Sequence, residues 1–138
     1  MKVLLEHANI TVKNLEASIK FITTAFPDFK VRHQGTNNGV RWAHVGTNDT
    51  YLALGEEAPN PRPTDTSYDT CGVNHLGYVV DDADEVRARL LKAGYKEGFV
   101  PPPHPHRKRV YIFDPEGMEW EFIQYLSDDP AKRHDYSL

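Results

Sequence analysis

Apolar and polar residues alternate along several short stretches of the chain. Between residues 6 and 12, Ala8, Ile10 and Val12 alternate with polar neighbours, which is typical of a strand with one buried face. Similar patterns predict further strands. These are Arg41 to Val45, Tyr51 to Leu54, His75 to Val80, Arg109 to Phe113 and Glu119 to Tyr125.

Two stretches have helical spacing instead. Asn14 is a suitable N-cap for a helix over residues 15–25, which Pro27 ends. Asp82, with Glu85 three residues later, forms a capping-box pattern for a second helix, and Gly94 stops it. A strong turn signal, Asp114-Pro115-Glu116-Gly117, joins the last two strands.

The chain resembles itself at an offset of 68 positions. His7 then falls on His75 and Arg41 on Arg109, so each half has a strand, a helix and later strands. We therefore expect an α+β fold of two βαβββ modules, with a curved mixed sheet around a concave cleft and the helices outside. The expected parts of this single domain are module one (3–55), a proline-bearing linker (56–72), module two (73–126) and a polar tail (127–138).

The length, charge and cysteine content of the chain exclude several classes of protein. The 138 residues suit one domain, and the net charge of −4 gives no general attraction to nucleic acid or anionic lipid. No stretch is long and apolar enough to span a membrane. The single cysteine, Cys71, excludes an internal disulfide framework and favours a reducing compartment. We expect a cytoplasmic protein whose partner is a small molecule.

The polar faces of the strands carry the candidate chemistry. If the apolar faces cover the helices, the opposite faces point into the concave side of the sheet. His7 and His75 are equivalent in the repeat, and Glu121 falls on Ala53 by the same offset. Two histidines and one carboxylate suit a divalent ion with open positions, which can be Fe, Mn, Ni, Co or Zn. His44, with the other parity, is expected against a helix.

These residues resemble the vicinal oxygen chelate superfamily, which includes glyoxalase I, extradiol dioxygenases, fosfomycin-resistance enzymes and bleomycin-resistance proteins. The resemblance covers about residues 3–125. It rests on paired modules, the two first-strand histidines, and the Glu121 that follows the turn at Asp114. It implies that His7, His75 and Glu121 are the metal ligands, and that substrate oxygens bind the ion directly. Some relatives have a fourth ligand where this chain has Ala53.

Further site residues are expected on the concave face. Tyr111 lies ten residues before Glu121, as in extradiol dioxygenases, and is a catalytic candidate; Glu119 is a candidate general base. The candidates for substrate binding are Asn9, Tyr51, Arg41 and Arg109.

The sequence thus predicts a metal-dependent enzyme, a glyoxalase-like lyase or a dioxygenase, acting on a small oxygenated substrate and assembled as a homodimer. The alternative is a metal-free protein that sequesters a small molecule, as bleomycin-resistance proteins do. The proline-rich loop around His104 and His106 is either a substrate-gripping lid or a charged solvent loop. Whether His7 joins His75 from its own chain or from a neighbour stays open.

Overall fold

The computed structural model describes residues 5–56 and 73–138 and divides the chain into two compact units, residues 1–62 and 63–138. The expected linker and Cys71 lie largely outside the described residues. The first unit contains β1 (His7–Val12), α1 (Leu15–Ala25), β2 (Lys30–Asn37), β3 (Val40–Gly46) and β4 (Tyr51–Glu56). The second contains β5 (His75–Val79), α2 (Ala83–Lys92), β6 (Lys96–Glu97), β7 (Arg107–Phe113), β8 (Glu119–Tyr125) and α3 (Pro130–Arg133).

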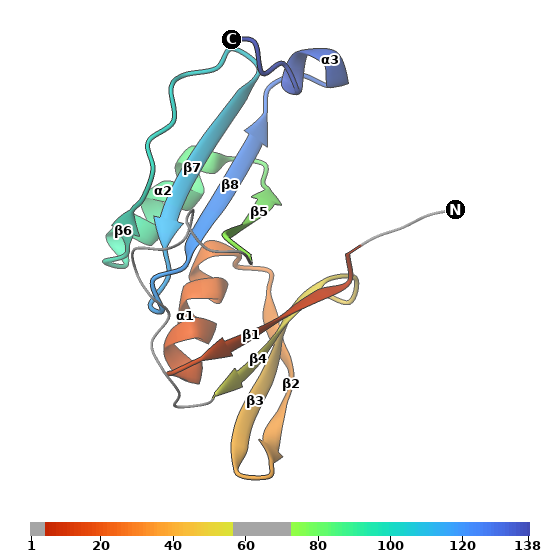
Figure 1. Ribbon diagram of the computed structural model, residues 1–138, viewed down its shortest axis with the longest axis vertical. Coiled ribbons are helices and arrows are strands. Elements are labelled where there is room, and N and C mark those ends of the chain that lie inside the picture. The colour runs from red at the N-terminus through yellow and green to blue at the C-terminus, as the bar shows by residue number, and fades with distance from the viewer. Residues whose placement is uncertain (1–4, 57–72) are drawn as a thin grey trace. The chain divides into compact units, whose positions relative to one another are not determined.

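Each unit has one four-stranded mixed sheet. The strand order is β1-β4-β3-β2 in the first and β5-β8-β7-β6 in the second, and the first strand of each pairs in parallel with the last. Figure 1 shows β1 and β4 side by side in the first unit, and β7 beside β8 in the second. This is the α+β architecture of paired βαβββ modules that the repeat predicts.

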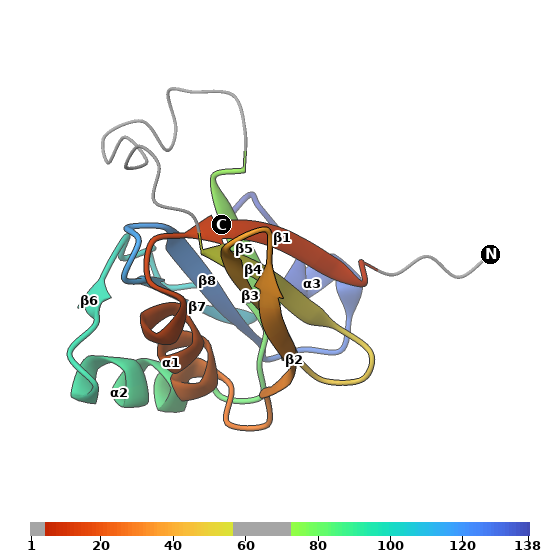
Figure 2. The ribbon, with the colours of Figure 1, turned by 90° about the horizontal axis from the view of Figure 1, so that it is seen from below.

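One helix covers one face of each sheet. In the first unit, α1 contacts β3 and β4 (Figure 2), and Phe21 and Ile22 are buried there against Ala43 and Val45, which are fully enclosed. In the second, α2 contacts β6, β7 and β8, and Leu90, Ile112 and Trp120 are buried. The other face of each sheet carries the polar residues.

The local signals in the sequence are confirmed. The Asn14 side chain accepts a hydrogen bond from the Ala17 backbone at 2.8 Å, and Asp82 accepts one from Glu85 at 2.9 Å, so both helices begin where expected. Gly117 has φ of 81°, which the turn before β8 requires.

Three elements were not located from the sequence pattern. The βαβββ modules require a strand after each helix, but the pattern within β2 is too polar to indicate its position, and β6 has only two residues. The polar tail contains α3 and packs on its own unit. Arg107 donates to the Arg133 carbonyl at 2.7 Å, and the His104 ring lies 2.9 Å from the Asp135 carbonyl. These contacts also tie the proline-rich loop to the tail.

Candidate functional site

The open face of the first sheet is lined by aromatic rings around Tyr51. His7 lies opposite Tyr51 in the β1–β4 register and stacks on its ring, with centroids 4.9 Å apart. The His7 Nδ1 atom is 2.9 Å from a carboxylate oxygen of Glu6, which leaves Nε2 available as a ligand. His44 lies on β3, the other neighbour of β4, and its ring centroid is 4.8 Å from that of Tyr51. Asn9 is exposed two residues along β1.

The open face of the second sheet brings His75 and Glu121 together. The distance from His75 Nε2 to Glu121 Oε2 is 3.1 Å. Gly77 pairs with Glu121 in the β5–β8 register, and a Cβ atom there would lie 3.7 Å from the same Oε2 atom. The small residue therefore leaves the face clear beside the carboxylate. This is the pairing that the sequence predicts for these two residues.

Both ring nitrogens of His75 face oxygen atoms that accept hydrogen bonds. Its Nδ1 atom lies 2.7 Å from the Asn74 side-chain oxygen, and its Nε2 atom faces Glu121. A neutral imidazole has one N–H and one nitrogen lone pair, so one ring nitrogen can donate while the other is able to bind a metal ion. With Nδ1 fixed by Asn74, Nε2 is oriented as a ligand. The pair fits a divalent cation.

Tyr111 lies beside this pair. Its side chain is almost fully buried, and its ring is 5.9 Å from His75 in an edge-on arrangement. Burial raises the pKa of the Tyr111 phenol well above its usual value, and a hydrogen bond to Glu121 raises it further. The phenol therefore keeps its proton at neutral pH, with the Glu121 carboxylate nearby. Arg109 lies two residues before Tyr111 on β7, so both side chains lie on the expected face.

Glu119 has a different environment from the one expected of a general base. Its side chain is buried, and Oε1 accepts a hydrogen bond from the Phe99 backbone at 2.7 Å. The neighbouring Gly98 donates to the Tyr111 carbonyl, also at 2.7 Å. The Phe99 ring then lies 5.5 Å from the Tyr111 ring. Glu119 thus fixes the start of the proline-rich loop against Tyr111.

The expected position of Arg41 is wrong. Arg41 lies on the α1 side of its sheet and pairs with Glu16 and with Glu56, whose carboxylate also accepts from the Leu15 backbone. His44, expected against a helix, instead lies on the open face with Tyr51. Both errors have one cause, which is a change of one residue in the repeat offset at β3.

The repeat offset is not constant. In β1 and β4 the offset of 68 holds, since His7 pairs with Tyr51 as His75 pairs with Glu119. In β3, however, His44 pairs with Ala53 as Tyr111 pairs with Glu121, an offset of 67. The β3–β4 turn is therefore one residue shorter than the β7–β8 turn. A shift of one residue moves every side chain of a strand to the other face, so Arg41 and Arg109 lie on opposite sides.

Sequence reasoning missed three residues that contribute to these faces. Asn74 orients His75, Phe99 packs on Tyr111, and Arg32 lies over the Tyr51 ring, with its guanidinium carbon 4.6 Å from the centroid. No pattern signals Phe99 or Arg32, because each is placed by a loop or by an irregular strand. Asn74 could have been predicted to contact His75, because it directly precedes this candidate ligand in the sequence.

The described residues contain no cluster of three or more metal-ligating side chains. His7 belongs to the first unit, and His75 and Glu121 belong to the second. The structure therefore joins two of the three expected ligands. Likewise, no helix in those two ranges is long and apolar enough to cross a bilayer.

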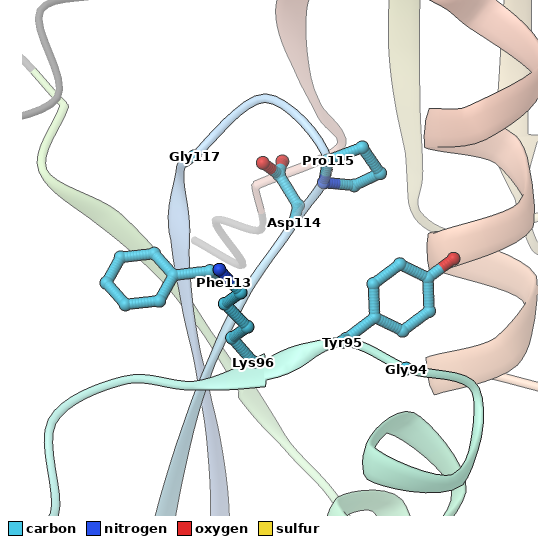
Figure 3. A pocket seen from close by; sticks show the side chains of 7 residues that line it. All are labelled: Gly94, Tyr95, Lys96, Phe113, Asp114, Pro115 and Gly117. Carbon is cyan, nitrogen blue, oxygen red and sulfur yellow. The ribbon is translucent and has the colours of Figure 1, made fainter.

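A hollow of about 380 Å³ lies elsewhere in the second unit, beside the turn at residues 114–117. Figure 3 shows Tyr95 and Phe113 on opposite sides of it, with Lys96 between them. The carboxylate of Asp114 accepts hydrogen bonds from the Glu116 and Met118 backbones and from Trp120, so it serves the turn. None of the predicted site residues lines this hollow.

Paired βαβββ modules, each with a histidine on the open face of its first strand, and a carboxylate on the last strand of the second module are the features of the α+β class that the sequence resembles. A profile of that class matches residues 4–122. The chain belongs to the Glyoxalase/Bleomycin resistance protein/Dioxygenase superfamily.

Three relatives of the chain carry names that indicate different activities. The chain is 29% identical over 140 residues to a "Probable trivalent organoarsenical cleaving enzyme" of Bacillus subtilis (strain 168), covering 95% of this chain and 86% of that protein. The glyoxalase I of Leishmania major has a similar fold, with a TM-score of 0.68 and 21% identity over 89% of this chain and 87% of that one. The fosfomycin-resistance protein FosX from Listeria monocytogenes, in complex with Mn(II) and sulfate, has a TM-score of 0.69 and 15% identity, covering 98% and 100%.

Proposed function

We propose that the protein is a divalent-metal-dependent enzyme of the vicinal oxygen chelate type, with His7, His75 and Glu121 as ligands. The observation that carries the proposal is the contact between His75 Nε2 and Glu121 Oε2, with the other histidine nitrogen fixed by Asn74. Two imidazoles and one carboxylate leave coordination positions for two substrate oxygens. When bound, the ion would supply Lewis-acid stabilisation of a developing negative charge on oxygen.

The chain's own residues would then orient the substrate. Tyr111 holds its proton beside Glu121, so its phenol can donate a hydrogen bond to the carboxylate or to an oxygen atom of a ligand. Arg109 lies next to it and supplies positive charge on the same face. Phe99 packs edge-on against one side of the Tyr111 ring. Small-molecule chemistry of the lyase or dioxygenase kind suits this arrangement.

The substrate class that we propose binds through oxygen. The organoarsenical named for the Bacillus subtilis relative is a different case, because trivalent arsenic is soft and prefers several thiolate ligands. The chain has one cysteine, Cys71, so it cannot supply a pair of thiolates from a single copy. The substrate that we propose is a small oxygenated molecule.

Metal binding to the chelator-treated full chain tests the proposal. Calorimetric titration with Mn(II) should give one site per chain, and the changes His7→Ala, His75→Ala and Glu121→Gln should each abolish it. His106→Ala is a matched control, because this histidine has no equivalent partner in the repeat, and it should bind Mn(II) as the natural protein does. Circular dichroism checks that each variant folds.

Two results would contradict the proposal. Absence of binding to Mn(II), Fe(II), Ni(II), Co(II) and Zn(II) would favour the metal-free sequestering function instead. Retention of the site in all three ligand variants would place the metal elsewhere. We also propose a homodimer, which sedimentation should report as a species of twice the mass of the 15.7 kDa chain; a monomer at micromolar concentration would exclude it.

A further inference from the structure

An irregularity in β2 places Arg32 on the open face of the first sheet. Val31 pairs with Val45 and His33 pairs with the preceding residue of β3, His44, so Arg32 is an extra residue in the strand. A bulge of this kind bends the strand and redirects a side chain. The Arg32 guanidinium consequently lies over the Tyr51 ring, 4.6 Å from its centroid.

One nitrogen of the Arg32 guanidinium lacks a hydrogen-bond partner among the described residues, as do the Nε atoms of Arg107 and Arg133 in the second unit. Arg41, Arg87 and Arg89 each pair with a carboxylate. Within residues 5–56 and 73–138, by contrast, the Nη1 atom of Arg32 is buried and has no hydrogen-bond partner. A buried donor without a partner is costly, and the cost is greater for a charged group. Arg32 is therefore a cation of this face whose hydrogen-bonding capacity is not fully used within the described protein.

The surroundings of Arg32 favour a negatively charged acceptor. His44 contacts the same Tyr51 ring, and His33 is its partner across the strands. The pKa of His44 is lowered first by burial and then by electrostatic interactions with His33, Arg32 and His7, while Glu6 acts in the opposite sense. Glu6 is itself bonded to His7. The face thus combines several cationic or donor groups with the flat rings of Tyr51, His44 and Trp42.

We propose that Arg32 binds an oxyanion, a carboxylate or phosphonate, of a ligand whose body packs against the Tyr51 and His44 rings. A planar guanidinium binds such groups through two parallel hydrogen bonds. Since His7 stacks on the same Tyr51 ring, the anion would lie beside a proposed metal ligand. Identification of this ligand as the substrate rests on the proposed function; the anion site itself does not.

Calorimetry with the full chain in excess EDTA tests the site without any metal. Phenylphosphonate should bind, and benzyl alcohol, which has the ring but no charge, should not. Arg32→Gln should weaken phenylphosphonate binding by about tenfold or more, because a charge-assisted hydrogen bond is lost. Lys30→Gln removes a positive charge from the same strand and should change the affinity by less than about twofold, since a screened surface charge contributes little.

The outcomes separate the possibilities. Equal affinity in Arg32→Gln and the natural protein, or equal affinity for phenylphosphonate and benzyl alcohol, would overturn the proposal. Equal affinity for inorganic phosphate and phenylphosphonate would overturn the contact with the rings. If Arg32→Gln does not fold, Arg32→Lys and the shifts of the Tyr51 and His44 NMR signals on titration decide the matter; unmoved signals would refute the site. Anion binding in EDTA together with failed Mn(II) binding would refute only the metal proposal.

Discussion

Gly98 has no room for a side chain. A Cβ atom at this position would collide with Glu119 Oε1, the atom that accepts the hydrogen bond from Phe99. We expect Gly98→Ala to lower the free energy of unfolding by about 1–3 kcal/mol, because the buried carboxylate must move and its hydrogen bond breaks. Urea denaturation measures the change.

A second glycine provides the control for this prediction. A Cβ atom added at Gly55 meets no atom within 4 Å, so Gly55→Ala should change stability by much less. The clash also predicts coupling, because Gly98→Ala should cost less in a Glu119→Ala background than in the natural chain. Additive effects of the two changes would show that Glu119 does not hold the loop.

Glu56 provides a prediction of pH dependence. The Arg41 guanidinium and then the Leu15 backbone N–H lower the pKa of Glu56 below its ordinary value of 4.5. A lowered pKa means that the unfolded chain binds the proton more readily, so this carboxylate stabilises the fold above about pH 4.5 and loses its effect as the pH falls through the folded-state value.

The measurement is the difference in unfolding free energy between the natural protein and Glu56→Gln from pH 7 to pH 3. We expect the difference to be largest at pH 7 and to shrink towards pH 3. Asp49→Asn, the same loss of one carboxylate in an exposed turn, is the control. A difference that stays constant with pH would mean that the ionised carboxylate of Glu56 contributes no stability.

At the scale of elements, the helix caps are the best test of the local signals. Asp82→Ala removes the oxygen that accepts from Glu85 and an acidic charge at the start of α2, and should cost about 1 kcal/mol. Asp81→Ala changes the adjacent exposed carboxylate, which does not cap the helix, and should be nearly neutral. Thermal denaturation of both variants provides the comparison, and equal effects would refute the cap.

The elements that the sequence predicts are those with strong local signals. Caps at Asn14 and Asp82 and the turn before β8 determine boundaries through a few neighbouring atoms, so the pattern alone suffices. The β3–β4 turn differs by one residue from its counterpart, and parity reasoning cannot detect such a change unless the pairing register is known. The predicted faces of Arg41 and His44 were wrong for this reason. The bulge in β2 likewise prevented a prediction of the face on which Arg32 lies.

At the scale of the whole molecule, the repeat predicted both sheets, and the resemblance predicted the family. The pairing of His75 with Glu121 followed from strand parity within one unit, because β5 and β8 are neighbours. The position of His7 relative to that pair depends on how two sheets are arranged, which no local pattern encodes. The third ligand accordingly remains a proposal, and stability measurements on the complete chain can test it.

A ligand that binds only the folded state raises its stability in proportion to the logarithm of ligand concentration. Mn(II) at 100 times its dissociation constant should stabilise the natural protein by about 2.7 kcal/mol. The gain should disappear in Glu121→Gln and equally in His7→Ala, although these residues lie in different units. His106→Ala should keep it. If His7→Ala retained the full gain, the first unit would supply no ligand, and the metal would be held by the His75–Glu121 pair without it.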